Sequence, residues 1–235
     1  MSQHWRPVMT TLPLNTPGSS DNHSSIHTKR LRMRPLARSD LHAYHVLRLQ
    51  PEAMAHSTYR RPDANLEESS VKLDSIIAAA QPRCFYFGIF LAETGELIGD
   101  GGVHTLSSQA CGWPELGYKL KREYWGRGLC TEFLTAYLKW WWGLPRRSID
   151  RSGGGAGVAV GVQISVHPRS IAAAGGGNGA CSKAVAVEQL YAWTTLDNFA
   201  SQNVLRKAGF KSFIIWKQPG YEEWVIGWRN SRPRP

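Results

Sequence analysis

The chain has few cysteines, and their spacing argues against two kinds of site. Its 235 residues include four cysteines, Cys84, Cys111, Cys130 and Cys181, and no two of them form a C-x-x-C pair. Small disulfide frameworks need dense cysteines, and structural zinc sites use closely spaced pairs. We therefore expect no disulfide framework, no metal and a reducing compartment, which we take to be the cytoplasm.

The sequence also lacks the segments that target a chain to a membrane or to nucleic acid. No apolar run reaches the roughly 20 residues that a bilayer-spanning helix needs, and no apolar core of a secretion signal follows the N-terminus. No zinc-finger spacing or aromatic and basic RNA-binding motif is present. We expect neither a membrane nor a nucleic-acid partner, although a basic nucleic-acid binder stays open as a hypothesis.

Acidic residues are in the minority, at 18 against 28 Lys and Arg, which gives a formal charge of +10. Such a charge predicts an anionic ligand or surface without specifying which one. The apolar content of 42% and the length suffice for one core. We predict a disordered tail over 1–29, a domain over 30–229 with a flexible Gly/Ala/Ser-rich insertion over 146–186, and a C-terminal tail over 230–235.

Hydrophobic periodicity and turn residues predict strands and helices in alternation. The order indicates an α+β fold, with a mixed and mostly antiparallel sheet and helices on both of its faces. Glycines 99, 101 and 102 predict a bulge or a close backbone approach in the second hairpin strand. The expected elements are a strand at 31–36, a helix at 39–50, a loop at 51–62, a helix at 65–80, a hairpin at 84–93 and 97 onward, a strand at 188–193, a helix at 198–209, and strands at 211–217 and 222–229.

The stretch 115–142 organises the rest of the chain. It begins as a strand from Glu115, continues through Gly126 and Gly128, and ends in an apolar segment with helical spacing. A helix that starts at a glycine turn presents unpaired amides and partial positive charge to an anion. The stretch therefore predicts a phosphate site, with an ordinary connection and a solvated basic rim as the alternative.

The residues around the turn argue against two classes of phosphate-binding site. No Gly-Lys-Ser/Thr follows it, so the Walker pattern is absent. A dinucleotide fingerprint would require a third glycine where Thr131 stands, which makes that interpretation weak.

Two blocks in order resemble the GNAT N-acetyltransferase superfamily. The first is Tyr124-Trp125-Gly126-Arg127-Gly128-Leu129, and the second places Asn198 and Ser201 ahead of Lys207-Ala208-Gly209-Phe210. More narrowly, the chain resembles the branch of the ribosomal-protein alanine acetyltransferases. The likeness covers roughly 30–144 and 187–229.

The resemblance implies the acyl-CoA N-acyltransferase fold, in which strands 115–121 and 188–194 are parallel neighbours that splay apart around acetyl-CoA. It implies an enzyme that moves an acetyl group from acetyl-CoA to a primary amine by direct attack in a ternary complex. Loops carry no code for the acceptor, so a protein N-terminus and a small amine stay open. The alternative is a non-catalytic module that binds acyl-CoA or a partner.

Residues that match the family's cofactor site follow from the two blocks and the strand before them. The family pattern has Gln or Arg three residues before the first glycine, where this chain has Glu123; the adjacent Arg122 can compensate for its charge. The implied cofactor-binding residues are Tyr118, Leu120, Arg122, Trp125, Gly126, Arg127, Gly128, Leu129, Asn198 and Ser201.

Glu115 is the candidate general base, because family members often carry a carboxylate at that place; the alternative is a solvent-exposed strand-edge residue. Ser201 is the candidate that protonates the leaving thiolate, or it contacts the cofactor only. Tyr191 is a less favoured proton donor. Asn198 can bind pantetheine amides, cap a helix, or do both.

Three further residues are weaker candidates. Tyr59 and Arg60 lie in a loop that borders the acceptor pocket in the resembling family. Cys130 follows a helix N-terminus, where a thiol can be acidic, but we interpret it as a packed cysteine.

Overall fold

The computed structural model describes residues 10–13, 25–79, 85–108, 110–149, 187–217 and 223–233. The predicted insertion beyond Ile149 and most of the predicted N-terminal tail lie outside these residues.

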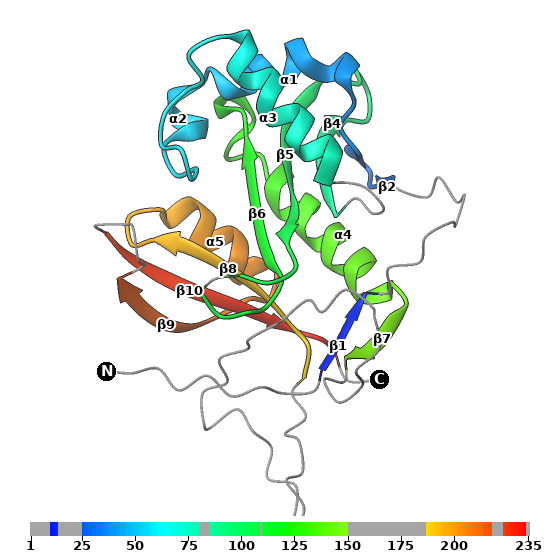
Figure 1. The fold of residues 1–235 in the computed structure, drawn as a ribbon, viewed down its shortest axis with the longest axis vertical. Helices are drawn as coiled ribbons and strands as arrows, with labels where there is room; N and C mark the ends of the chain where they lie inside the picture. The colour runs from blue at the N-terminus through cyan, green and yellow to red at the C-terminus, as the bar shows by residue number, and fades with distance from the viewer. Residues whose placement is uncertain are drawn as a thin grey trace, which may run out of the picture.

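Eight strands form the central sheet, in the order β2-β3-β4-β5-β6-β8-β10-β9 (Figure 1). Neighbouring strands are antiparallel except β6 and β8, which run parallel. The strands are β2 (Ile26–His27), β3 (Leu31–Arg34), β4 (Tyr86–Leu91), β5 (Leu97–Thr105), β6 (Glu115–Leu120), β8 (Gln189–Thr195), β9 (Lys211–Lys217) and β10 (Trp224–Ser231). The predicted α+β class with a mixed, mostly antiparallel sheet is confirmed.

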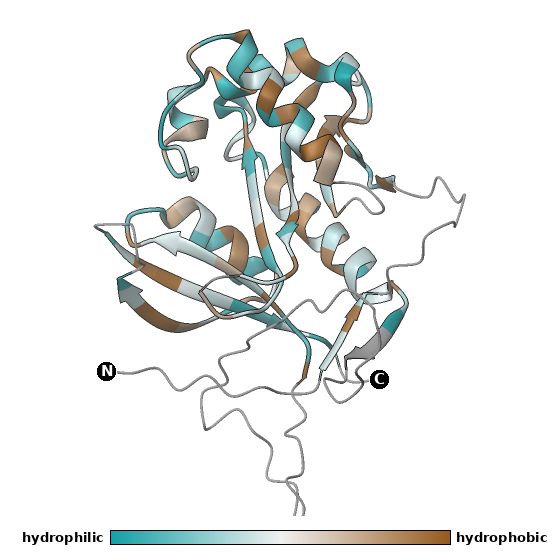
Figure 2. Ribbon diagram, viewed as in Figure 1, coloured by the Kyte–Doolittle hydropathy of each residue, from teal (hydrophilic) through white to brown (hydrophobic). Residues whose placement is uncertain are grey.

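Helices cover both faces of this sheet (Figure 1). Hydrophobic and hydrophilic residues alternate along α3, α4 and α5, as expected for helices with one face in the core (Figure 2). The helices are α1 (Leu41–Arg48), α2 (Pro51–Met54), α3 (Leu66–Ala79), α4 (Leu129–Gly143) and α5 (Phe199–Lys207), with short 3-10 turns at Arg38–Asp40 and Arg122–Tyr124.

Side chains of strand β4 pack into two hydrophobic clusters, one on each face of the sheet. Phe87 and Ile89 pack with α4, which buries Tyr137 and Trp141. The register of β4 shifts between Ile89 and Phe90, and Phe90 packs with α1 and α3 on the opposite face. Because successive side chains of a strand point to opposite faces, this alternation supports helices on each side.

The predicted hairpin and its second-strand bulge are confirmed. Gly95 occupies the turn with φ of 73°, and the Leu91 amide donates to the Glu96 carbonyl at 2.9 Å. The register of β5 shifts between Val103 and Thr105. A Cβ at Gly101 would lie 2.9 Å from the Phe133 ring, so the backbone of β5 approaches α4 closely.

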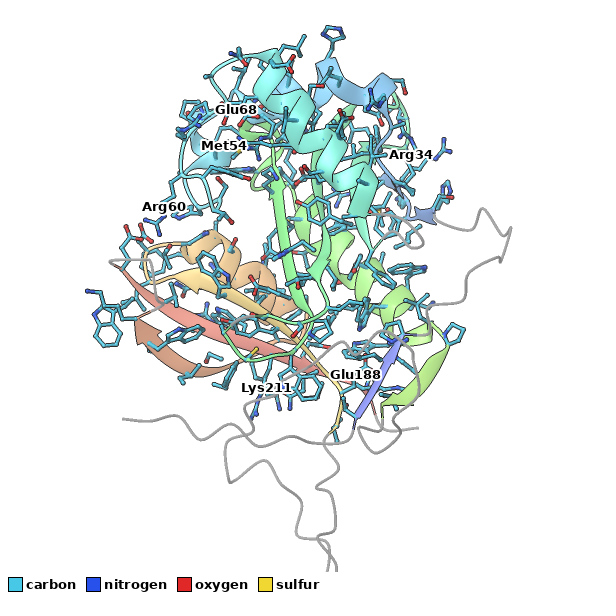
Figure 3. The ribbon with its side chains drawn as sticks, viewed as in Figure 1. Arg34, Met54, Arg60, Glu68, Glu188 and Lys211 are labelled. Carbon is cyan, nitrogen blue, oxygen red and sulfur yellow. The ribbon has the colours of Figure 1, made fainter. Side chains whose placement is uncertain are left out.

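Four predicted boundaries were wrong. Thr10–Pro13, placed in the tail, forms β1, which pairs antiparallel with β7 (Arg146–Ile149), placed in the insertion. Their shared partner is the buried Glu188, which accepts from Thr11 Oγ1 at 3.0 Å and from Arg146 Nε at 2.8 Å (Figure 3). Residues 26–27 form β2 in the predicted tail, and β10 runs to Ser231, into the predicted C-terminal tail.

The predicted loop 51–62 begins with the helix α2, which has Pro51 in its first turn. A proline is suited to that position because its missing N–H would have no helical partner. Met54 is fully buried, so this turn is fixed by packing (Figure 3).

Candidate active site

Strands β6 and β8 separate soon after they meet. The structure pairs them at Glu115 and Tyr191, where the Tyr191 amide donates to the Pro114 carbonyl at 2.9 Å, and they then diverge (Figure 1). A cavity of about 1600 Å³ lies along the gap. Ligand pockets are usually smaller, at roughly 300–1,000 Å³, so this one has room for a large ligand and a second molecule. The predicted splay of two parallel strands is confirmed.

The glycine turn and the start of α4 form one wall of the cavity. Gly126 and Gly128 have φ of 70° and 74°, a region that side chains disfavour, and a Cβ at Gly126 would meet open space. Gly128 is the N-cap of α4, so the amides of the residues that follow have no carbonyl partner within the helix. This wall therefore offers hydrogen-bond donors and partial positive charge to an anion.

Eight of the ten expected cofactor residues line the cavity: Tyr118, Leu120, Trp125, Gly126, Gly128, Leu129, Asn198 and Ser201. Arg122 and Arg127 are absent from this lining, and their expected contact with the cofactor stays a prediction. Their guanidinium carbons lie 4.9 Å and 5.4 Å from the ring centroids of Trp125 and Tyr124. Stacking on these rings keeps both charges at the rim.

Glu123, the residue that departs from the family pattern, is tied to the segment before α2. Its Oε2 accepts from Gln50 Nε2 at 2.9 Å, and Gln50 Oε1 accepts from the Arg122 amide at 2.7 Å. The carboxylate thus has an amide partner, and Glu123 is absent from the cavity wall.

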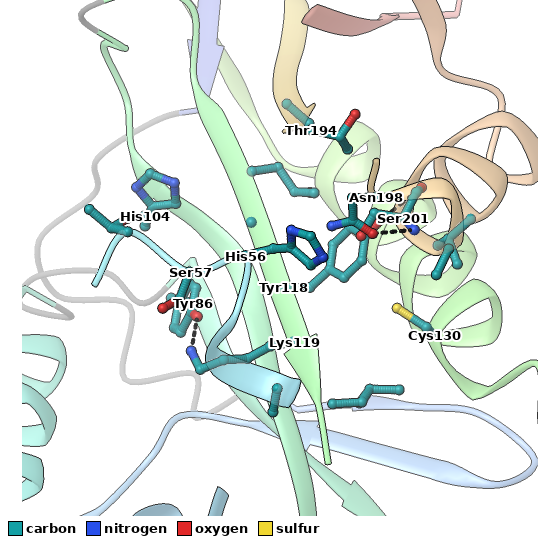
Figure 4. A pocket seen from close by; sticks show the side chains of 18 of the residues that line it. His56, Ser57, Tyr86, His104, Tyr118, Lys119, Cys130, Thr194, Asn198 and Ser201 are labelled. Atoms are coloured by element: carbon teal, nitrogen blue, oxygen red, sulfur yellow. Dashed lines mark hydrogen bonds between the residues drawn. The ribbon is translucent and has the colours of Figure 1, made fainter. Parts of the chain in front are cut away.

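Asn198 and Ser201 belong to the start of α5. Asn198 Oδ1 accepts from the Ser201 amide at 3.1 Å, which confirms the predicted helix cap (Figure 4). The Ser201 carbonyl accepts from the Tyr118 hydroxyl at 3.3 Å across the gap between the strands. Burial raises the pKa of Tyr118 well above its ordinary value, so this hydroxyl stays protonated.

Glu115 lies at the point where β6 and β8 diverge. Its carboxylate accepts from Ser108 Oγ at 2.5 Å and from Trp193 Nε1 at 2.9 Å, and it lies 3.5 Å from His104 Nε2. Burial disfavours the charged form, but these partners outweigh it and hold the pKa of Glu115 below its ordinary value. The side chain is largely enclosed, so the solvent-exposed alternative was wrong.

Tyr191 and Cys130 differ in whether they line the cavity. Tyr191 packs with Leu12, Cys111 and Trp113 and is absent from the cavity wall, which removes it as a proton donor. Cys130 does line the cavity, but burial raises the pKa of its thiol to about 12. The interpretation of Cys130 as a packed cysteine fits this environment, and the acidic-thiol alternative was wrong.

Comparison with protein-family models shows which family the chain belongs to. A model described as an acetyltransferase (GNAT) domain matches residues 30–211. The chain belongs to the GNAT acetyltransferase family. No curated protein sequence matches it significantly.

Solved GNAT structures share the fold at low sequence identity. An acetyltransferase of Bacillus anthracis is 14% identical with a TM-score of 0.60, covering 88% of this chain and 98% of its own. The ribosomal-protein alpha-N-acetyltransferase RimL with coenzyme A is 17% identical with a TM-score of 0.60, covering 88% and 97%. A microcin self-immunity acetyltransferase, MccE, with acetyl-CoA and AMP is 11% identical with a TM-score of 0.59, covering 87% and 93%.

The far end of the GNAT cavity, under α1 and α3, holds a buried ionic network that the sequence analysis missed. Asp63 Oδ1 lies 2.7 Å from Arg48 Nη2 and 2.5 Å from Lys72 Nζ. Arg48 and Lys72 line the cavity, and the Lys72 ammonium lies 4.0 Å from the ring centroid of Tyr59. The partners are distant in sequence, so only the helical period of α1 and α3 could have suggested that they meet.

The two loop candidates for acceptor contact have different positions. Tyr59 is in the cavity wall and about half exposed. Arg60 is not in the wall; its Nη1 pairs with Glu223 at 2.8 Å, which links the loop after α2 to the start of β10 (Figure 3).

A second network on the sheet also lines the cavity. Lys119 Nζ lies 2.7 Å from the buried Asp100 and 3.4 Å from the Tyr86 hydroxyl (Figure 4). Tyr86 on β4 and Lys119 on β6 both line the cavity, with β5 between their strands.

Two absences hold for the described part of the chain. No helix there is long and apolar enough to cross a membrane. No three His, Cys, Asp or Glu side chains there are grouped to hold a metal ion, and the expectation of a metal-free protein stays a prediction.

Proposed function

We propose that this protein transfers an acetyl group from acetyl-CoA to a primary amine, by direct attack within a ternary complex. The observation that carries the proposal is the gap between β6 and β8, which leads from Glu115 to the amides at the start of α4. The chain's membership of an acetyltransferase family supports it, as do the coenzyme A of RimL and the acetyl-CoA of MccE.

The residues present fit a pyrophosphate and an acyl-pantetheine arm. The turn at Gly126 and Gly128 leaves open space beside unpaired helix amides, which suits a diphosphate. We assign the arm to the backbone of Tyr118 and Leu120 and to Asn198 and Ser201, which line the gap. Acetyl-CoA would supply the activated acetyl group.

The chain's own groups would do three things for the acceptor. The cavity would hold the amine beside the acetyl group, which replaces a bimolecular encounter by a positioned one. Glu115 and the groups around it would receive the proton that an ammonium must lose. A backbone N–H near Tyr118 or Leu120 would stabilise negative charge on the acetyl oxygen, and Ser201 would contact the departing sulfur.

The acceptor is proposed only as a class: a protein N-terminus or a small amine. RimL is a ribosomal-protein alpha-N-acetyltransferase and MccE a self-immunity acetyltransferase, and both share this fold. The acceptor would enter at the end of the cavity that Tyr59, Arg48 and Lys72 line. We also propose that this activity is cytoplasmic, because sparse cysteines fit a reducing compartment.

Thiol release tests the proposal. The full chain is incubated with acetyl-CoA and a panel of N-terminal peptides, polyamines and amino acids, and free coenzyme A is measured. At least one amine is expected to raise thiol release well above the enzyme-free rate, with a matching acetylated product by mass spectrometry. Binding of acetyl-CoA without release by any amine of the panel would favour the non-catalytic module instead.

A further inference from the structure

His104 is brought to the cavity by the irregularity in β5. Leu116 pairs with Val103 and Glu115 pairs with Thr105, so His104 is the additional residue of the bulge. A bulge bends its strand and redirects a side chain, and bulges recur beside active sites. Here the His104 side chain lines the cavity (Figure 4).

The imidazole lies over a place on β6 that has no side chain. A Cβ built at Gly117 would lie 3.4 Å from His104 Cδ2 and 3.6 Å from Nε2. The ring therefore rests against the backbone of β6, two residues from Glu115 and one from Tyr118. This places it at the point where the two strands diverge.

A general base needs affinity for a proton and access to the acceptor, and Glu115 and His104 differ in both respects. The Glu115 carboxylate is enclosed, at 15% side-chain exposure, and Ser108 and Trp193 donate to its two oxygens. Each of these donors stabilises the anion and weakens its affinity for a proton. His104 is 45% exposed, and Glu115 is the charged group that its ring contacts within the described residues.

We propose that His104 Nδ1, the ring nitrogen that does not contact Glu115, accepts the proton from the acceptor ammonium, and that Glu115 is a positioning residue that orients the imidazole through Nε2. The inference rests on the proposed acetyl transfer and identifies the atom that accepts the first proton. Imidazole is the side chain that acts most often as a general base in catalysis.

The proton and bond changes balance without a further reactant. The ammonium gives one proton to His104 Nδ1 and becomes a neutral amine. The amine nitrogen forms a bond to the acetyl carbon as the carbon–sulfur bond breaks. The second amine proton ends on the departing sulfur, and the proton on His104 passes to water at its exposed side.

The test compares His104→Gln, His104→Ala and Glu115→Gln with the wild type. For both His104 variants we expect kcat to fall on the order of 10²–10⁴-fold, the usual contribution of a general base. Calorimetry is expected to show unchanged acetyl-CoA affinity, which also reports that the variants fold. Added imidazole is expected to restore part of the rate of His104→Ala but not of His104→Gln. Glu115→Gln is expected to lose less rate than either.

His42→Gln is the matched control, because His42 is exposed on α1 and absent from the cavity wall. Its rate is expected to equal that of the wild type. Wild-type turnover by His104→Gln would overturn the assignment, as would a large loss in His104→Ala that imidazole does not restore. A wild type that neither binds acetyl-CoA nor releases thiol would instead contradict the acetyl-transfer proposal.

Discussion

Asp63 is fully enclosed beneath the cavity and holds the charged side chains above it in place. It accepts from Arg48 Nε at 2.9 Å, from Ser69 Oγ at 2.7 Å and from Lys72 Nζ at 2.5 Å. Burial disfavours its charge, but these donors outweigh it and hold the pKa of Asp63 far below its ordinary value. The residue thus holds Arg48 and Lys72 in place at this end of the cavity, which Glu52, Glu67 and Glu68 also line.

Replacing Asp63 by Ala leaves the buried Arg48 without its counter-ion. Losing one partner of a buried ion pair typically costs about 3–5 kcal/mol. We expect Asp63→Ala to lower the free energy of unfolding by that order in urea titrations. Asp74→Ala is expected to change it little, because the half-buried Asp74 pairs only with the exposed Arg38 among the described residues. An Asp63→Ala protein as stable as the wild type would show that the network contributes nothing net.

The same contacts predict a pH dependence. Because the folded pKa of Asp63 is depressed, its contribution is fully present above its unfolded pKa of about 3.9. It is lost progressively as pH falls below that value toward the folded pKa. Urea titrations from pH 7 to 3 should show a steeper loss of stability for the wild type than for Asp63→Ala.

At the scale of elements, local patterns were sufficient for most of the sheet and for α4. The turn at Gly126 and Gly128 and the apolar face of α4 are local, so both could be read from spacing. Strands β1 and β7 could not, because Thr11 and Arg146 meet only through Glu188, far from Thr11 in sequence.

Most of the residues that line the cavity could also be predicted from the sequence. The strand, turn and helix that line the cavity carry recognisable residues, and eight of the ten expected cofactor residues lie in its wall. His104 was missed because its position depends on a bulge whose register is set by pairing with β6. Arg122 and Arg127 stack on Trp125 and Tyr124, each three residues away in sequence, and neither arginine lines the cavity.

The attachment of β1 is expected to depend on Glu188. Its carboxylate is fully buried, and both Thr11 and Arg146 donate to it. In Glu188→Ala, Arg146 would lose its counter-ion, and β1 would lose the hydrogen bond of Thr11 to Glu188 while keeping its ladder with β7. We expect the amides of Thr10–Pro13 to exchange at least tenfold faster by hydrogen-exchange mass spectrometry while β4 and β5 keep their protection. Exposed Glu93→Gln is the control, and unchanged exchange in β1 would refute the link.

At the scale of the molecule, the cavity is lined by segments far apart in the chain. The sheet and α4 line the end where we propose that the cofactor binds, and α1 and α3 line the opposite end. The segment after α1 reaches across: His56 Nδ1 lies 3.2 Å from Thr195 Oγ1, and Arg60 pairs with Glu223. The glycine turn, Glu115 with His104, and the proposed acceptor end thus line the same space.

The central claim is that a diphosphate binds at the Gly126 and Gly128 turn, and isothermal titration calorimetry of the full chain with coenzyme A and acetyl-CoA tests it most directly. The matched variants are Gly126→Val and Gly95→Val, because the two glycines have φ of 70° and 73° and a Cβ at either meets nothing within 4 Å. The backbone strain is therefore alike, and only Gly126 adjoins the cavity. We expect saturable binding to the wild type and to Gly95→Val, and at least tenfold weaker binding to Gly126→Val. No binding heat with the folded wild type, or equal affinity in all three proteins, would contradict the account.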